Sequence, residues 1–495
     1  MAKELWKGNE AIAEAAIRAG CDCFFGYPIT PQSEVPEYMS VHLPEHGGVF
    51  VQSESEVAAI NMVYGAAGAG MRAMTSSSSP GISLKQEGIT YLAGAEVPAV
   101  IVNCMRGGPG LGTIQPAQGD YYQATRGGGN GDYRTVVLAP SNVQETVDFV
   151  QEAFDIADQY RNPVVILADG LIGQMMEPIE WKPIAKRDLP PKDWAACGRK
   201  GRDHHNVINS LFIDPEECNQ LNNHLAEKYA EIAKNEVRWE EVECEDAELV
   251  ITAYGTPARI ALTALETLRA DGIKAGLFRP ITLWPFPEKA LHELAAKEHV
   301  RAFLDVEMSS TGQMMEPIEW HPVPKRDLPP KDWAASGRKD RDHHNVINSL
   351  YMDPEVCDRH NDHLAEKYAE MEKKEVRWEE VECEDAELVI TAYGTPARIA
   401  LTALETLRAN GIKAGLFRPI TLWPFPEKAL HELAAKEHVK AFLDVEMSSS
   451  GQMIDDVRLA VEGQKPISYL GHAGGVMPTV EEMIESAKKA LKEVK

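Results

Sequence analysis

Two glutamates at the start of a small-residue helix are the first candidates for chemistry. Glu54 and Glu56 lie in the stretch QSESEVAAI, which opens a predicted helix over residues 56–70. The alanines and glycines of that helix give it a thin face suited to close packing, so one of the glutamates is expected to be packed. First-turn glutamates also stabilise a helix by opposing its dipole, which leaves a purely structural interpretation open.

A proline-flanked threonine is the second candidate. The sequence YPITPQS, residues 27–33, follows the apolar run at 24–27 and precedes a helical pattern. Thr30 is therefore expected where a loop leaves the carboxyl end of a strand, which is where open parallel sheets bind their ligands. A proline-fixed turn with a threonine or serine helix cap explains the same residues equally well.

The third candidate is an arginine that opens a glycine-rich loop. The sequence RGGPGLG, residues 106–112, follows a predicted strand over 97–104. It does not fit the G-x-G-x-x-G pattern of dinucleotide sites, and the chain contains no P-loop signature. An arginine at a strand end can bind an anionic substrate through charge-assisted hydrogen bonds, so Arg106 is a candidate for that role. A flexible loop is the alternative.

The histidines and cysteines show no metal-site pattern. The eight cysteines include no C-x-x-C pair, which argues against both a ferredoxin-type iron–sulfur run and a zinc ribbon. The adjacent pairs His204-His205 and His343-His344 lie in connecting stretches and are not spaced to face one ligand together. We therefore expect no metal site in this chain.

Composition narrows the class of partner. The chain has 495 residues and a formal net charge of −26, and phosphate binding needs clustered lysine and arginine, so nucleic acid is not expected as a main partner. No run of 18 apolar residues occurs, and the first residues lead into an amphipathic pattern, so we expect a cytoplasmic protein without a membrane span.

Amphipathic stretches and short apolar runs alternate over the residues before position 173. Such alternation is typical of helices that cross between parallel strands, and it predicts an α/β fold. The predicted helices and strands cover residues 10–18, 24–27, 56–70, 97–104, 143–160 and 163–169.

A long internal repeat follows. Residues 173–311 recur as residues 312–450 at a constant offset of 139, and only 18 positions differ, 15 of them before residue 236. The period is far longer than the 20–50 residues of common repeat arrays, so we interpret it as a recent tandem duplication in a two-domain parent.

The repeat predicts a domain map. Only the second copy continues into residues 455–463, 467–470 and 480–491, which should supply a closing strand and two helices. We therefore expect the second copy to form a complete domain and the first to be a tethered, dispensable insertion. The predicted segments are a first domain at 1–182, a connector at 183–245 with a helix over 225–234, a truncated α/β copy at 246–311, a repeated connector at 312–384 and the complete copy at 385–495.

Several motifs in this order resemble one enzyme family. The segments GNEA at 8–11, GYPITP at 26–31, ESEVAA at 54–59, RGGP at 106–109 and QGD at 118–120 resemble the alpha subunit of 2-oxoacid:ferredoxin oxidoreductases. With one repeat removed, the resemblance covers the whole chain. The segments LPPKDW at 189–194 and NVINSL at 206–211 look most like the branched-chain (3-methyl-2-oxobutanoate) members, with the 2-oxoglutarate members as the alternative.

The resemblance implies a fold and a reaction. The fold would be a parallel-sheet domain that binds the pyrimidine of thiamine diphosphate, followed by an α/β domain like the carboxyl-terminal domain of transketolase. The reaction would be oxidative decarboxylation of a 2-oxoacid to an acyl-CoA and CO₂, with coenzyme A as cosubstrate and ferredoxin as electron acceptor.

The resemblance also assigns roles to residues. Glu56 matches the glutamate that bonds the pyrimidine ring nitrogen, with Glu54 as the nearest competitor. Pro28, Ile29 and Thr30 match a cofactor-binding segment, and Thr30 and Arg106 match positions near the substrate carboxylate. A beta subunit would hold the diphosphate and Mg²⁺, and a gamma subunit and a ferredoxin-like delta subunit with iron–sulfur clusters would complete the complex.

The chain departs from the family pattern at two places. The repeat has no counterpart, and His472 stands where an arginine is expected. A non-catalytic subunit disabled by the duplication is the runner-up from another class. A self-sufficient thiamine decarboxylase is disfavoured, because the Gly-Asp-Gly motif with its downstream asparagine is missing.

Overall fold

The computed structural model describes the chain except for residues 1–2, 183–186, 200, 309–348, 475 and 495. His343-His344 and about half of the repeated connector therefore lie outside the described residues. The chain divides into two compact units. The first comprises Met1–Ser210, Lys228–Glu316 and Asn348–Asn361, and the second comprises Leu211–Glu227, Pro317–Ile347 and Asp362–Lys495.

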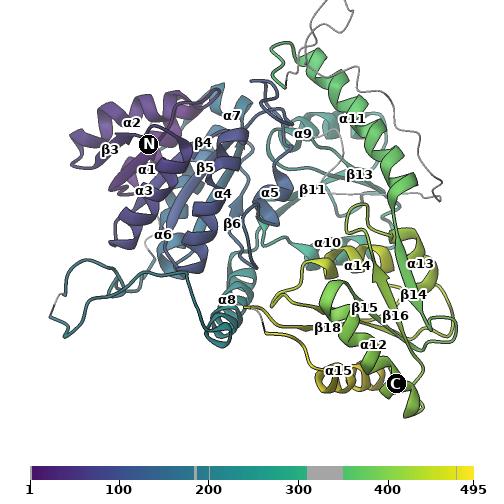
Figure 1. Cartoon of the computed structure of the whole chain (residues 1–495). Helices are drawn as coiled ribbons and strands as arrows, with labels where there is room; N and C mark the ends of the chain where they lie inside the picture. The colour runs from purple at the N-terminus through teal and green to yellow at the C-terminus, as the bar shows by residue number, and fades with distance from the viewer. Residues whose placement is uncertain (1–2, 183–186, 200, 309–348, 475, 495) are drawn as a thin grey trace, which may run out of the picture. The chain divides into compact units, whose positions relative to one another are not determined.

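A seven-stranded sheet forms the centre of the first unit (Figure 1). Its order is β12-β6-β7-β5-β4-β2-β3, and every pairing is parallel except that of β12 with β6. The strands are β2 Cys23–Gly26, β3 Val49–Gln52, β4 Ala73–Ser77, β5 Ala99–Met105, β6 Val136–Leu138, β7 Pro163–Asp169 and β12 Thr282–Trp284.

Helices flank this sheet because successive side chains of its strands point to opposite faces and are buried on both. Helices α3 and α4 pack on one face, where their apolar residues share a core with β2, β4, β5 and β7. The helices of this domain are α1 Gly8–Arg18, α2 Glu34–Glu45, α3 Glu56–Gly68, α4 Ser79–Gly94, α5 Tyr121–Thr125, α6 Val143–Tyr160 and α7 Gly170–Gln174. A small antiparallel pair, β1 Glu4–Lys7 with β8 Met176–Ile179, completes it. The parallel α/β fold predicted from the alternation is confirmed.

The first repeat builds a four-stranded sheet of order β13-β10-β11-β9. Its strands are β9 Trp239–Val242, β10 Leu249–Thr252, β11 Ala275–Pro280 and β13 Ala302–Asp305, and its helices are α8 Pro215–Glu236, α9 Gly255–Ala270 and α10 Glu288–Ala295. Strand β9 lies within the stretch predicted as a connector and pairs antiparallel with β11.

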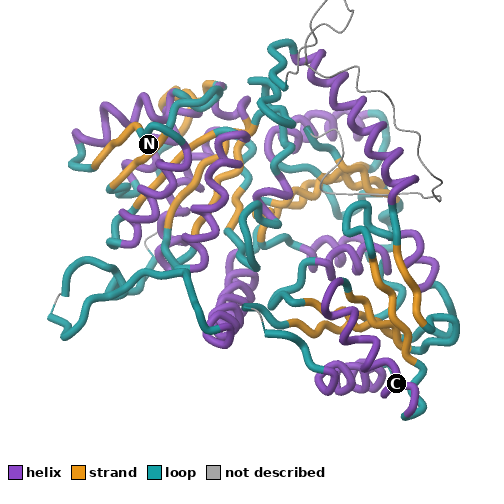
Figure 2. Tube along the Cα trace, viewed as in Figure 1, coloured by secondary structure: helices purple, strands orange, loops and turns teal. Residues whose placement is uncertain are grey.

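The second repeat builds the same sheet with one more strand. Figure 2 draws the strands of both repeats in orange. The order is β14-β16-β15-β17-β18, so β18 lies beside β17, the counterpart of the edge strand β13. Its strands are β14 Trp378–Val381, β15 Leu388–Ala392, β16 Ala414–Pro419, β17 Ala441–Glu446 and β18 Ile467–Gly471. Its helices are α11 Pro354–Glu375, α12 Gly394–Ala409, α13 Glu427–Ala434, α14 Met453–Val461 and α15 Val480–Glu493.

Buried Glu446 holds the closing part of the second repeat together. Its carboxylate accepts hydrogen bonds of 3.0 Å from the backbone N–H groups of Gln452, Met453 and Ile454 at the start of α14. These donors have no partners inside the helix, and a carboxylate there also opposes the helix dipole. The strand and two helices expected after residue 450 are therefore present.

The first repeat packs directly on the amino-terminal domain. Its edge segment β12 pairs with β6, and the N–H of Ala139 donates to the carbonyl of Ile281 at 2.9 Å. Leu283 and Tyr254 are fully buried in the core shared with the seven-stranded sheet. The first repeat is therefore packed on the first domain as well as tethered to it, because these residues find complementary partners there. Its dispensability stays a prediction.

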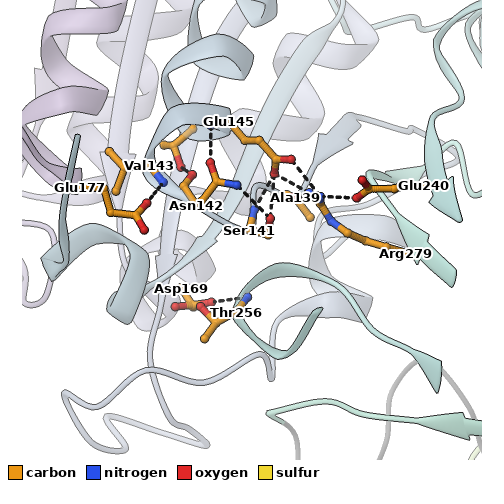
Figure 3. A network of polar contacts seen from close by, with 11 residues as sticks. Ala139, Ser141, Asn142, Val143, Glu145, Asp169, Glu177, Glu240, Thr256 and Arg279 are labelled. Atoms are coloured by element: carbon orange, nitrogen blue, oxygen red, sulfur yellow. Dashed lines mark hydrogen bonds and ion pairs between the residues drawn. The ribbon is translucent and has the colours of Figure 1, made fainter. Parts of the chain in front are cut away.

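An ion pair accompanies this packing (Figure 3). Arg279 donates to both carboxylate oxygens of Glu145, at 2.5 and 2.9 Å, and also pairs with Glu240 at 3.1 Å. Burial acts to raise the pKa of Glu145, but the hydrogen bonds and charge of Arg279 outweigh it and hold that pKa below its usual value. The pair is therefore charged at neutral pH.

None of the helices in the described parts of the chain is long and apolar enough to cross a membrane.

Candidate functional site

The candidate residues meet at the carboxyl edge of the seven-stranded sheet. Thr30 follows β2, Glu56 follows β3, Ser77–Ser79 end and follow β4, and Arg106 follows β5. Because β3, β2, β4 and β5 are neighbours and parallel, their carboxyl ends share one edge. Loops at that edge form the binding crevice of open parallel sheets.

Glu56 is the buried member of the two candidate glutamates. It is the first residue of α3 and is 6% exposed, whereas Glu54 is exposed. The hydroxyl of Ser55 caps the helix by accepting from the N–H of Ala58 at 3.2 Å. A separate residue therefore caps the helix, which leaves the Glu56 carboxylate available for another contact.

Glycine at position 81 lets α4 approach this carboxylate. A Cβ atom at Gly81 would lie 2.1 Å from Oγ of Ser77 and 2.7 Å from Oε1 of Glu56. Within the described residues, the buried hydroxyls of Ser77 and Ser78 have no hydrogen-bond partner. Buried polar groups are normally paired, so the orphan hydroxyl of Ser77 beside a buried carboxylate, with a second orphan hydroxyl on the next residue, indicates a place for a polar ligand.

Lys85 is a cation whose charge interacts with that of Glu56. It lies on α4, is fully buried and donates to Oγ1 of Thr75 at 3.0 Å. Burial lowers the pKa of the Lys85 ammonium to about 8, against the charge of Glu56, which acts to raise it. Burial thus disfavours the charged form of Lys85, and the charge of the Glu56 carboxylate partly offsets this effect.

Arg106 and Thr30 are brought together, but through the backbone. The Arg106 guanidinium donates to the carbonyls of Thr30 at 2.9 Å and Leu111 at 3.0 Å. Its buried Nε has no hydrogen-bond partner among the described residues, and burial lowers the pKa of the side chain. Thr30 itself is exposed, so its hydroxyl is accessible at the rim of the site.

The other two residues assigned from the resemblance also lie at this rim. Pro28 is exposed and Ile29 is half-buried, in the loop between β2 and α2. The five residues Pro28, Ile29, Thr30, Glu56 and Arg106 therefore follow three parallel strands of one sheet, β2, β3 and β5.

A polar cluster connects the rim to the first repeat. Asp120 accepts from Ser79 at 2.6 Å and from Asn103 at 2.8 Å, and burial raises its pKa. Two residues earlier, the side chain of Gln118 donates to the carbonyl of Tyr254 at 3.0 Å. The QGD motif thus links the site to the repeat through the side chains of its first and third residues.

Two other sequence candidates, His472 and His204, contact carboxylates. Nε2 of His472 is 3.2 Å from Oε1 of Glu482, so it contacts a carboxylate rather than a free anion site. His204 pairs with Asp203 at 2.6 Å. Over the described ranges, no cluster of histidine, cysteine and acidic residues could hold a metal ion.

Sequence reasoning missed Lys85, Ser77 and Ser78. The signal for Lys85 was its spacing, because the buried residues of α4 at 81, 82, 85, 86, 88 and 89 follow one helix face. The signal for the serines was the polar end of an otherwise apolar strand.

Two family models match the chain. Residues 14–243 match the thiamine diphosphate-binding domain of pyruvate flavodoxin/ferredoxin oxidoreductase. Residues 247–329 and 386–483 match core domain II of pyruvate:ferredoxin oxidoreductase. The second match is split between the two repeats.

Similar proteins include subunits of two archaeal oxidoreductases. Ketoisovalerate oxidoreductase subunit VorB of Methanothermobacter marburgensis is 56% identical over 319 residues, which cover 64% of this chain and 90% of the relative. 2-Oxoglutarate synthase subunit KorA of Methanothermobacter thermautotrophicus is 39% identical over 342 residues, which cover 63% and 89%. A solved 2-oxoglutarate:ferredoxin oxidoreductase from Magnetococcus marinus is 22% identical, covers 100% of this chain and 66% of that chain, and has a TM-score of 0.37, too low to transfer structural detail.

The lowered pKa of Lys85 predicts a pH dependence of stability. Because the folded pKa lies below the usual lysine value, unfolding takes up a proton between these two values, and stability rises with pH across that window. We expect Lys85→Met to remove about 2 kcal/mol of this rise between pH 8 and pH 9.5, relative to Lys289→Met at an exposed site. Urea unfolding at the two pH values measures it, and an equal rise in both variants would contradict a buried ammonium at position 85.

Proposed function

Because this chain belongs to the 2-oxoacid:ferredoxin oxidoreductases, we propose that it is the subunit that binds the pyrimidine half of thiamine diphosphate. The proposed reaction is oxidative decarboxylation of 3-methyl-2-oxobutanoate to an acyl-CoA and CO₂, with electrons passed to ferredoxin. The site's position supports this, since all the assigned residues lie at one sheet edge within the matched thiamine domain.

The observation that carries the proposal is the buried Glu56 carboxylate beside the orphan hydroxyl of Ser77, which a second orphan hydroxyl follows at Ser78. An aminopyrimidine presents ring nitrogens and an amino group, which match a carboxylate and hydroxyls as hydrogen-bonding partners. Gly81 keeps the space beside Glu56 free of a side chain. The residues present therefore fit the pyrimidine.

Glu56 would hold and transfer a proton at the pyrimidine ring nitrogen. When bound, thiamine diphosphate supplies the electron sink that allows a 2-oxoacid to lose CO₂. A positioned carboxylate contributes to such a reaction as a general acid and base. Lys85 would set the charge around Glu56, since the two are electrostatically coupled inside the protein.

Arg106 and Thr30 would orient the substrate carboxylate. The Nε–H of Arg106 is buried without a partner, and the hydroxyl of Thr30 is exposed at the rim. Both can donate to an anionic group, and orientation of the substrate lowers the entropic part of the barrier.

The branched-chain substrate is favoured over 2-oxoglutarate. The ketoisovalerate relative is 56% identical to this chain and the 2-oxoglutarate relative 39%. A 2-oxoglutarate site also needs a partner for a second carboxylate, whereas an isopropyl group needs only an apolar pocket.

The remaining cofactors are assigned to other chains. The family motif for the metal and diphosphate is missing from the sequence, and the eight cysteines are free and scattered. We therefore propose that a beta subunit holds Mg²⁺ and the diphosphate, that a gamma subunit and a cluster-bearing delta subunit complete a cytoplasmic complex, and that coenzyme A is the acyl acceptor.

We also propose that the repeat arose by tandem duplication. The two copies differ at 18 positions and build sheets of the same strand order. The alignment with VorB covers 90% of that relative but only 64% of this chain. The length of the relative therefore matches a chain with one copy of the repeat.

Glu56→Gln tests the proposed function. In the complex with partner subunits, we expect this variant to fold and assemble but to turn over about 10²-fold more slowly, the scale of a lost general acid or base. Glu54→Gln is the matched control, because Glu54 is exposed two residues earlier. Normal turnover by Glu56→Gln, or an equal loss in the control, would end the assignment.

Arg106→Ala tests substrate orientation. We expect kcat/KM for the 2-oxoacid to fall by the equivalent of about 1.5–3 kcal/mol, because one charge-assisted contact is lost. Cofactor retention should be unchanged in equilibrium dialysis against thiamine diphosphate. Release of the cofactor instead would show that Arg106 serves the cofactor or the loop fold. Arg106→Lys keeps the charge, so its kcat/KM should lie between those of Arg106→Ala and the unchanged protein.

A further inference from the structure

The first repeat is held on the amino-terminal domain by a defined set of residues. This docking face comprises residues 254–256, 279 and 281–284. Residues 282–284 form an edge strand on β6, Arg279 pairs with Glu145, and the N–H of Thr256 lies 3.4 Å from Oδ2 of Asp169 (Figure 3). These contacts combine strand pairing, charge and apolar burial.

The second repeat carries the same face in identical sequence. Residues 272–300 and 411–439 do not differ at any position, and neither do residues 236–270 and 375–409. The counterpart face is therefore residues 393–395, 418 and 420–423. Any partner recognised by the first face is chemically acceptable to the second.

The counterpart face is much more exposed. Leu283 is 1% exposed, whereas its counterpart Leu422 is 45% exposed. Ile420 and Trp423 are about half exposed as well, at 50% and 53%. Adjacent large apolar side chains in water are a marker of a binding surface.

The backbone conformation of residues 282–284 also differs from that of their counterparts 421–423. Residues 282–284 form β12, whereas the identical residues 421–423 form no strand in the structure as described. Since the two sequences match, the presence of the β6 edge decides whether the strand forms. An extended segment that adds to a sheet edge gains backbone hydrogen bonds as well as side-chain contacts.

The charges point to the same partner. Arg418 pairs with Glu379 at 2.9 Å, just as Arg279 pairs with Glu240 in the first repeat. The further carboxylate that Arg279 meets is Glu145, which the amino-terminal domain supplies. The counterpart face therefore fits an acidic sheet edge like that of β6 and Glu145.

We propose that the second repeat docks on the amino-terminal domain of a second copy of this chain, in place of that copy's first repeat. Each exchanged contact repeats one seen within the chain, so exchange loses no interactions and costs only association entropy. At low concentration each amino-terminal domain binds the first repeat of its own chain, because that binding is intramolecular. Binding of the second repeat of another chain increases as the protein concentration rises. The evidence for this exchange does not rest on the proposed thiamine function.

Two charge-swap variants test the proposal with matched composition. Glu145→Arg combined with Arg418→Glu makes the second repeat the attractive partner and leaves Arg279 repelled. Glu145→Arg combined with Arg279→Glu does the reverse. We expect the first variant to dimerise at a concentration at least about 10-fold lower than the second, measured by sedimentation velocity on the full chain.

Each variant introduces one repulsive pair within a repeat. Arg418→Glu faces Glu379, and Arg279→Glu faces Glu240, so the destabilisation of the repeat itself is matched between the two variants. Thermal unfolding by circular dichroism identifies a variant that does not fold. In that case the single variants Leu283→Asp and Leu422→Asp, on the wild-type Glu145 background, replace the charge-swap pair. Leu283→Asp weakens docking of the first repeat, and Leu422→Asp weakens docking of the second. Leu283→Asp should then dimerise and Leu422→Asp should stay monomeric. Equal association of the two members of either pair, or stronger association of the opposite member, overturns the proposal.

Discussion

Parallel pairing of β3, β2, β4 and β5 is the constraint on which the candidate site depends. It places the loop with Thr30, the helix start with Glu56, the serines after β4 and Arg106 at one edge, although up to 76 residues separate Thr30 from Arg106. Glu56 and Lys85 can then be buried near each other on α3 and α4, which Gly81 allows to approach. A carboxylate and an ammonium in a low-dielectric interior interact more strongly than they would in water.

The first repeat adds a second layer to this arrangement. Gln118 bonds the backbone of Tyr254, and two residues later Asp120 holds Ser79 and Asn103 beside the Arg106 strand end. Docking of the repeat and order at the site are therefore linked through a three-residue motif. The same docking residues recur in the second repeat. One sequence is therefore buried against the amino-terminal domain in the first repeat and exposed in the second.

The fold was predictable where local pattern and tertiary environment agree. The ranges 143–160 and 163–169 were identified to the residue, because a strongly amphipathic helix and an apolar strand each have an unambiguous period. Strand β9 was not found, because WEEV carries little apolar signal and becomes a strand by pairing with β11. The environment of residues 421–423 could not be read from a sequence identical to that of β12. At the site, Glu56 followed from a motif, but burial is what separates it from Glu54, and Lys85 required the three-dimensional approach of α4 to α3.

The central claim is that this chain supplies one half of a shared thiamine site, built around Glu56. The most direct measurement is thiamine diphosphate-dependent decarboxylation of 3-methyl-2-oxobutanoate by the purified chain, alone and after mixing with the beta, gamma and delta subunits. The account predicts no turnover and no iron–sulfur absorbance for the chain alone, and turnover with ferredoxin reduction for the mixture. Turnover by the chain alone, or bound iron in it, would contradict the account.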